Sequence, residues 1–313
     1  MERGGRAVRR WAGCDGWCAS AGRSAGSEAL VRRLARTILI GCALLMLFAC
    51  SAPTPMCVRT SIYEYSEEVL LNENPSFLDT YQYSLSLEYP DSIITSDGVQ
   101  RQALCETVRR ELVEAIFGTE DVHAALSGEW NDLIRSGKNA PGADVRSGDD
   151  DFVRCAKILQ EKRLREARSK WQQARDTLTG DIRFLSVRVC YISGTHNDIL
   201  SCHYYIKEDE FGSRQTCYER GINYAPDGRH LFEADLFKEG WEESLTELLS
   251  ESFSSGFKTR DLTPFGPVRP NGNFKFNSGG IIWMYDAGEI APAKDGILRV
   301  SLPWSSLQPL MRE

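Results

Sequence analysis

Residues 273–311, NFKFNSGGIIWMYDAGEIAPAKDGILRVSLPWSSLQPLM, decide the fold that we expect for this chain. They consist of short apolar or alternating runs separated by glycines and prolines, which is the pattern of sheet strands joined by tight turns. Pro303 should end the last strand, and Ser305 or Ser306 should cap a short terminal helix. The pattern predicts three strands, near residues 274–276, 281–283 and 297–300.

A second run, HLFEADLFKEGWEESLTELL at residues 230–249, lies upstream of these strands. Its order and spacing relative to Tyr285, Glu289 and the closing Leu307 and Leu310 are more specific than either stretch alone. Together the two stretches resemble the C-terminal domain of RsiV-like envelope proteins, whose namesake is the extracellular part of a lysozyme-sensing anti-sigma factor. In that family a D-L-F strand end precedes an amphipathic helix. The resemblance implies an α+β fold in which an antiparallel meander sheet is packed by amphipathic helices.

The resemblance also supplies three candidate ligand-binding residues. Tyr285 and Glu289 belong to the matching pattern near the C-terminus. Arg214 closes the segment 211–214, which is the nearest counterpart of a Gly-Gly-Ala-His element of the family. The segment lacks the second Gly, the Ala and the His of that element.

The first 49 residues form a basic leader with eight Arg and three acidic residues, a net charge of +5. Their apolar run at 37–48 is shorter than the roughly 20 residues that a membrane-spanning helix needs. It ends in Leu47-Phe48-Ala49-Cys50, which resembles a bacterial lipobox. We therefore expect cleavage before Cys50 and lipidation of its thiol, which gives a lipid anchor in a membrane. An uncleaved, weakly hydrophobic anchor is the alternative.

Charge and flanking sequence indicate the compartment. The chain has a net charge of −7 and the leader one of +5, so the remainder carries −12. Such a body disfavours nucleic acid as a partner, because phosphates would be repelled. Ser51 follows the expected lipidated cysteine without an acidic cluster, which resembles the sorting pattern of outer-membrane lipoproteins facing the periplasm. We therefore expect a lipoprotein of the cell envelope.

The remainder divides by composition into segments with different expected structures. Residues 81–89, YQYSLSLEY, alternate and predict a half-buried strand, and residues 101–117 repeat apolar residues every four positions and predict an amphipathic helix. The expected organisation is a leader at 1–49, a lipidated tether at 50–60, a strand and helix part at 61–137, a loop at 138–151, a long helix at 152–180 and an RsiV-like sheet and helix domain at 181–313.

Short polar connections predict an antiparallel meander of three strands, at residues 183–192, 199–206 and 215–224. A five-residue loop at 194–198 would place Cys190 directly opposite Cys202, and Cys217 in the same row. A disulfide between Cys190 and Cys202 is one interpretation for an exported protein. Small apolar residues that fill a tight core row are the other.

No motif in the sequence predicts a catalytic residue, a metal site or a cofactor. His196, Asp198 and His203 lie close together, but the third ligand spacing of a zinc site is missing and turn formation explains the first two. Acids at 208–210 belong to an expected solvated hairpin tip, where they would stay ionised instead of acting as a general acid. A carboxylate pair of a glycosidase, brought together by folding, is the catalytic alternative.

Two classes of function follow from these observations. The first is a non-catalytic envelope lipoprotein that binds a protein or cell-wall ligand, lysozyme-like or peptidoglycan-related, as the resemblance to a lysozyme sensor implies. The alternative is an envelope hydrolase that acts on glycan or peptidoglycan, because some family members join this domain to a deacetylase domain. No stretch of the chain resembles that deacetylase.

Overall fold

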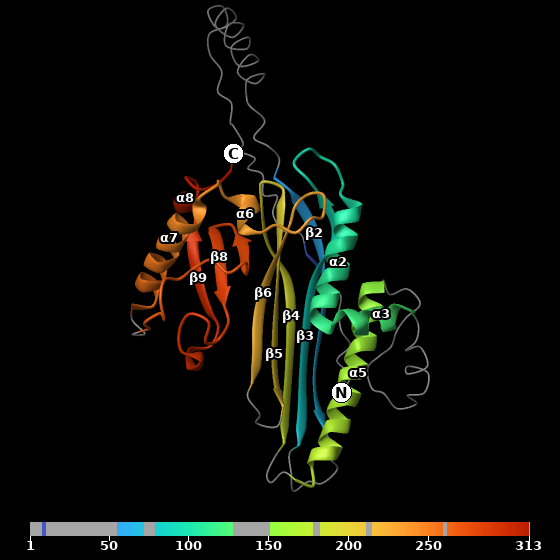
Figure 1. Cartoon of the computed structure of the whole chain (residues 1–313). Helices are drawn as coiled ribbons and strands as arrows, with labels where there is room; N and C mark the ends of the chain where they lie inside the picture. Colours follow the sequence, from blue (N-terminus) through green and yellow to red (C-terminus); the bar gives the residue numbers. More distant parts are fainter. Residues whose placement is uncertain are drawn as a thin grey trace, which may run out of the picture.

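The computed structural model describes residues 8–10, 55–71, 79–127, 151–177, 182–210, 215–258 and 262–312. Their helices and two sheets form the α+β arrangement predicted from the sequence (Figure 1). Cys50, Arg214 and residues 138–150 of the expected loop lie outside these ranges, as does all of the leader except residues 8–10.

The larger sheet, called the long sheet below, has the strand order β1-β2-β3-β4-β5-β6. Neighbouring strands are antiparallel except β3 and β4, which run parallel, and β4 to β6 form the predicted meander. The expected boundary at residue 180 therefore falls between two paired strands of one sheet. The strands are β1 (Val8–Arg10), β2 (Cys57–Leu70), β3 (Thr80–Ile94), β4 (Arg183–His196), β5 (Ile199–Glu210) and β6 (Thr216–Tyr224).

Strand β2 has no counterpart among the predicted elements. It begins at Cys57, inside the segment expected to be a tether at 50–60, and pairs with β3 along its whole length. The Tyr65 ring lies 6.2 Å from the Tyr83 ring of β3, and the Tyr63 hydroxyl donates to Gln160 of helix α5. These long-range contacts stabilise a strand that carries two glutamates, Glu64 and Glu68, on its other face.

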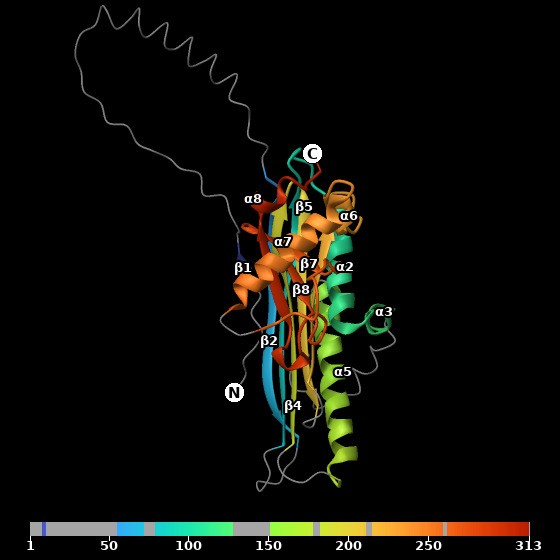
Figure 2. The same ribbon diagram turned by 60° about the vertical axis from the view of Figure 1, so that its left-hand side comes forward.

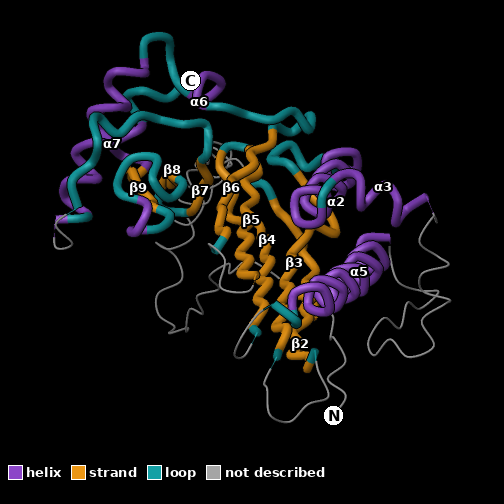
Figure 3. The backbone as a smooth tube through the Cα atoms, turned by 60° about the horizontal axis from the view of Figure 1, so that its bottom comes forward, coloured by secondary structure: helices purple, strands orange, loops and turns teal. Residues whose placement is uncertain are grey.

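Helices α2 (Gln102–Phe117) and α5 (Asp151–Ala174) cover one face of the long sheet, with α3 (Thr119–Ser127) beside them (Figures 1 and 3). They confirm the two predicted amphipathic helices. Their apolar stripes and the odd-numbered side chains of β3, such as Leu85 and Leu87, form one buried cluster. The helices also supply the long crossover connection that the parallel pair of β3 and β4 requires.

The smaller sheet, called the short sheet below, has the order β7-β8-β9 and confirms the three strands predicted near the C-terminus. Helix α7 packs on it, and Trp283, Tyr285, Val300 and Leu302 are buried there with Leu245 and Leu249 of the helix. Figure 2 shows α7 lying across the short strands. The elements are β7 (Phe274–Asn277), β8 (Gly280–Tyr285), β9 (Leu298–Pro303), α7 (Trp241–Gly256) and the short helices α6 (Glu233–Leu236), η2 (Ala293–Asp295) and α8 (Trp304–Leu307).

Two local predictions in this region are wrong. The D-L-F segment forms helix α6 instead of a strand end, because the Asp235 side chain accepts a hydrogen bond of 2.9 Å from the backbone N–H of Phe232 and closes the first turn. The terminal helix α8 starts at Trp304 with Pro303 before it, so neither Ser305 nor Ser306 is its cap. Pro303 has the extended backbone of a residue that precedes a helix, with φ −70° and ψ 152°, and its missing N–H removes no hydrogen bond from the helix.

The predicted register of the β4–β5 hairpin is also wrong. Its turn has only two residues, Asn197 and Asp198, with φ of 47° and 60°, as in a type I′ turn. This turn and a bulge between Ile192 and Gly194 together place Cys190 opposite Tyr204 and Cys202 opposite Ile192. Diagonal neighbours of this kind are separated by about 7–8 Å, more than a disulfide usually spans.

Both thiols are free in the structure, and burial raises the pKa of each. Cys217 lies opposite Lys207, away from that row. The arrangement agrees with the interpretation of Cys190 and Cys202 as small core residues.

Candidate functional site

The face of the long sheet that the helices leave free is divided into two halves. The half near the β4–β5 turn is covered by the short sheet, whose strand β7 contacts β4, β5 and β6. The other half is not covered by any helix or strand of the described chain (Figure 3). We call it the open face.

Strand β7 rests on the long sheet through the backbone edge that does not pair with β8. An unpaired strand edge must find partners for its N–H and C=O groups when it is buried. Here the N–H of Phe276 donates to Ser201 Oγ, and Phe274 O accepts from Asn223 Nδ2, both at 2.9 Å. Ser193 Oγ donates to Phe276 O at 2.5 Å. Polar side chains of one sheet thus replace the missing neighbouring strand of the other.

Gly221 permits this close approach. A Cβ atom at position 221 would lie 1.9 Å from Phe274 O, a separation that real side chains do not adopt. The Gly221 N–H also donates to Asn273 Oδ1 at 3.0 Å. The backbone of β6 and the backbone of β7 are therefore in direct contact, so the two sheets have no room to slide.

A buried ionic cluster lies under this junction and is centred on Glu219 of β6, which is 1% exposed. His203 Nε2 lies 2.5 Å from Glu219 Oε1, Arg299 Nε donates to the same oxygen at 3.0 Å, and Lys275 Nζ donates at 3.3 Å. Burial by itself would raise the pKa of Glu219, but hydrogen bonds from His203 and Arg299 outweigh it and lower the pKa to about 2. Glu219 is therefore an anion that joins both sheets.

This cluster has the groups of an acid–base site but not the access of one. His203 is 4% exposed, and burial lowers its pKa, which keeps the ring neutral. Lys275 also donates to the Tyr191 hydroxyl at 2.9 Å, so it is paired twice. A general acid or base needs a substrate within hydrogen-bond reach. We interpret the cluster as a structural junction that the sequence did not reveal, because its members are scattered from residue 191 to residue 299.

The three ligand-binding candidates from the sequence do not come together. Tyr285 is fully buried, and its hydroxyl donates to Arg269 O at 3.0 Å. Glu289 is exposed, but both of its oxygens are engaged: Oε2 accepts from Asp286 N at 2.8 Å and Oε1 from Asn271 Nδ2 at 2.9 Å. It stabilises the turn after β8. Arg214 lies outside the described residues.

The histidines and aspartate weighed as metal ligands are also separated. The His196 ring stacks on Trp304 with 3.8 Å between centroids, and Asp198 Oδ1 accepts from Ser96 N at 2.7 Å. His203 belongs to the ionic cluster. Among the described residues, no group of three or more metal-ligating side chains is close enough to hold an ion.

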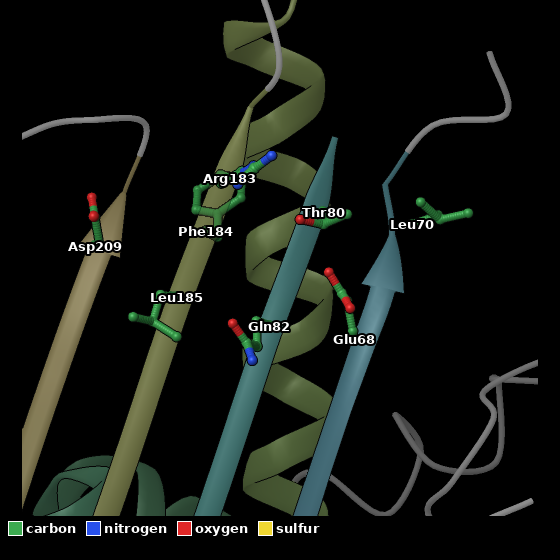
Figure 4. A pocket seen from close by; sticks show the side chains of 8 residues that line it. All are labelled: Glu68, Leu70, Thr80, Gln82, Arg183, Phe184, Leu185 and Asp209. Carbon is green, nitrogen blue, oxygen red and sulfur yellow. The ribbon is translucent and has the colours of Figure 1, made fainter. Parts of the chain in front are cut away.

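A hollow of about 610 Å³ lies on the open face, at the end of the long sheet remote from the short sheet (Figure 4). We call it the groove. Strand register places four of its side chains in one row across β2, β3, β4 and β5. A second row, one step nearer the end of the strands, adds Leu70, Thr80 and Arg183. The first row is Glu68, Gln82, Leu185 and Asp209.

The charged and amide side chains of the groove differ from those of the ionic cluster in being unpaired. Within the described ranges, Glu68, Gln82, Arg183 and Asp209 make no side-chain hydrogen bond or ion pair with one another or with other groups. Asp209 Oδ1 is even withdrawn from solvent without a partner among those residues. Buried polar atoms are usually hydrogen-bonded, so an unpaired one in a hollow indicates a place for a ligand.

The two carboxylates of the groove are poorly placed for glycoside hydrolysis. Glu68 and Asp209 stand in one row with two strands between them, and three strand spacings amount to about 14 Å. Glycosidases of either stereochemistry hold their carboxyl groups closer, at about 5–9.5 Å. Glu68 and Asp209 therefore do not form the close carboxylate pair of a glycosidase.

The structure describes no helix that combines the length and the apolar character needed to cross a membrane. The predicted signal segment at 37–48 lies outside the described residues.

Comparisons with known proteins agree with the architecture. Residues 234–305, from α6 to the start of α8, match the family described as "Protein of unknown function (DUF3298)". A solved member of that family from Bacteroides fragilis is 14% identical, with a TM-score of 0.56 over 82% of this chain and 94% of its own. One from Pseudomonas aeruginosa is 12% identical, with a TM-score of 0.44 over 83% and 96%. No curated protein sequence matches the chain. Residues 234–305 thus carry a DUF3298 domain, within a fold shared with a solved member of that family.

Proposed function

We propose that this chain is a non-catalytic lipoprotein of the bacterial envelope that binds a protein or cell-wall ligand in the groove. The observation that carries the proposal is the set of unpaired polar side chains on the open face, in contrast to the paired charges of the cluster around Glu219. A pocket of 300–1,000 Å³ with a few convergent polar groups is typical of a binding site, and about 610 Å³ lies in that range.

The position of the groove supports a tethered receptor. Lipidation at Cys50 would attach the chain to the membrane a few residues before Cys57, where β2 begins. The groove lies at the other end of the same strand, near Leu70, and a strand of this length extends about 43 Å. The groove would therefore project away from the bilayer. By analogy with RsiV-like proteins, we propose that the anchor holds the chain at the membrane and that the groove senses the ligand.

Charge supports two ligand classes, of which the first is a basic protein such as a lysozyme-like enzyme. A body of net charge −12 would attract a cationic protein and accelerate its binding. The second is peptidoglycan, whose charged groups could pair with the unpaired charged side chains of the groove. A hydrolase is less well supported, because the two acids of the groove are too far apart.

The test is retention on purified peptidoglycan and on immobilised lysozyme. The wild-type domain should bind at least one of them, and the double variant Arg183→Gln, Asp209→Asn should bind it at least tenfold more weakly. Lys207→Gln, which removes a cation of the same sheet face outside the groove, is the matched control and should bind normally. Failure of the wild type to bind either material would contradict the proposal.

The anchor has its own test. Cys50→Ser should leave an unprocessed precursor or a soluble form, because no thiol is available for the diacylglyceryl group. Membrane fractionation and the size of the product distinguish these outcomes from the wild type. Unchanged size and membrane association in the variant would count against lipidation at Cys50.

A further inference from the structure

We infer that the groove binds a peptide carrying both ammonium and carboxylate groups, in preference to a neutral glycan. The inference rests on the proposed function and specifies which part of a cell-wall or protein ligand the groove contacts. It follows from the arrangement of charge, from the apolar side chains at one end, and from the fact that the described lining residues offer no aromatic platform.

The charges of the groove alternate in sign across the sheet. Strand geometry places the Cα atoms of Arg183 and Asp209 about 8 Å apart and those of Glu68 and Asp209 about 14 Å apart, with Arg183 between the two acids. A neutral ligand would leave a guanidinium and two carboxylates without counter-charges. A short peptide offers a carboxylate to Arg183 and amino groups to the acids, and such charge-assisted hydrogen bonds are the stronger kind.

The described residues of the groove offer no flat aromatic surface on which a sugar ring could lie. Among the described residues that line it, the one aromatic side chain is Phe184, which is 4% exposed and belongs to the core under the helices. Figure 4 shows the polar side chains standing on the near side of the strands, with a helix behind them. Ligand contacts must therefore be made by polar and aliphatic groups.

Leu70 and Leu185 supply the apolar part of the groove. Leu70 is 62% exposed and Leu185 is half-buried, so both are accessible to a ligand. Gln82 and Thr80 lie next to them and can pair with backbone amides of a ligand. The groove therefore offers aliphatic contact, amide pairing and charges of both signs. These suit a charged peptide with small or aliphatic residues.

Isothermal titration of the purified domain tests the inference with three probes. They are the tetrapeptide Ala-Glu-Lys-Ala with free termini, the same peptide acetylated and amidated at its ends with its charged side chains replaced by glutamine, and neutral chitotetraose. The charged peptide should bind at least tenfold more tightly than either other probe, and its affinity should fall as salt rises. Equal affinity for chitotetraose or for the uncharged peptide would overturn the inference.

Variants separate the groove from the rest of the surface. Arg183→Gln and Asp209→Asn should each weaken binding of the charged peptide about tenfold, the effect of losing one charged hydrogen bond. Lys207→Gln and Glu64→Gln, on the same face outside the groove, should leave the affinity unchanged. Unaltered binding in both groove variants would place the peptide elsewhere and overturn the inference.

Retention on peptidoglycan or lysozyme, measured beside the titrations, distinguishes the two levels of proposal. A wild-type domain that is retained on either material but does not prefer the charged peptide contradicts the inference alone. A domain that binds neither material nor any of the probes contradicts the proposed function as well.

Discussion

The two faces of the long sheet are covered in chemically different ways. Helices α2 and α5 cover one face through a continuous apolar cluster, in which Leu87 and Leu112 are completely buried. On the other face the short sheet docks through serine, asparagine and backbone hydrogen bonds around the ion cluster of Glu219. Apolar burial is non-directional, whereas hydrogen-bonded and ionic contacts depend on geometry.

This difference explains how one face of the long sheet can be covered completely while half of the other face stays open. The helix-covered face contributes most of the burial that stabilises the sheet. The polar junction fixes the position of the short sheet on the long sheet, because its hydrogen bonds form in only one relative placement of the two. The remaining half of that face can therefore carry polar side chains without partners. If it were purely apolar, leaving it uncovered would promote aggregation.

The largest expected effect tests the polar junction. Glu219→Ala should lower the free energy of unfolding by about 3 to 5 kcal/mol, because it leaves Lys275 and Arg299 without a counter-charge. Urea denaturation measures the change. Glu64→Ala is the matched control: Glu64 stands in the same register row but is exposed on β2, and its loss should cost less than about 0.5 kcal/mol.

A second variant tests the apolar face. Leu87→Ala should cost about 2 to 5 kcal/mol, the range for a buried leucine that leaves a cavity. Val187→Ala, a half-buried position on the opposite face of the sheet, should cost about 1 kcal/mol or less. Equal losses in the two variants would mean that the faces do not differ in the way described.

A third variant tests the close contact of the two sheets. Gly221→Ala should cost about 1 to 3 kcal/mol, because the new methyl group collides with Phe274 O and must displace β7. Gly256→Ala is the control, since a Cβ there meets nothing within 4 Å. Hydrogen exchange should show faster exchange in residues 274–277 of the Gly221 variant and unchanged exchange in α2. A variant as stable as the wild type would argue against the tight junction.

The smallest effect concerns pH. Burial lowers the pKa of His203 below its ordinary 6.5 in the folded protein, so the unfolded chain takes up the proton first and stability falls as the pH drops below 6.5. Protonation would add charge beside Lys275 and Arg299, with only Glu219 to balance it. His203→Gln should therefore lose less stability between pH 7 and pH 5 than the wild type.

Below pH 5, both the wild type and the His203→Gln variant should lose further stability. The pKa of Glu219 is about 2 in the folded state and 4.5 ordinarily, so its contribution is present above pH 4.5 and disappears as the pH falls toward 2. Thermal unfolding midpoints measured from pH 7 to pH 3 check both windows. Identical pH profiles from pH 7 to pH 5 would exclude His203 as a source of the first.

Local patterns predicted the elements with strong periodicity. The alternation at 81–89, the four-residue repeat at 101–117 and the glycine-separated runs after residue 273 each correspond to an element of the structure. Strand β2 carries the same alternation in Tyr63, Glu64 and Tyr65, so its signal was present but the preceding segment was interpreted as a tether.

The candidate site could not be predicted in the same way. The groove unites Glu68, Gln82, Arg183 and Asp209 only because β3 pairs with β4 in parallel, and no periodicity reports which strands become neighbours. The register of the β4–β5 hairpin was mispredicted for a related reason: turn length and bulges set it. Asn197-Asp198 closes the hairpin with two residues instead of five, and a bulge lies between Ile192 and Gly194. Tyr285 carried the resemblance but belongs to the core.

The parallel pairing of β3 and β4 has a consequence for the order of events in folding. The pairs β2–β3 and β4–β5–β6 join near neighbours in sequence, whereas the hydrogen bond of Ile182 N to Asp79 Oδ1, where the parallel pair begins, links residues 103 positions apart. Closing so long a connection loses more chain entropy, so we expect this pairing to form late. Because the groove spans both sides of it, recovery of ligand binding during refolding should lag behind the formation of secondary structure, and simultaneous recovery would contradict this order.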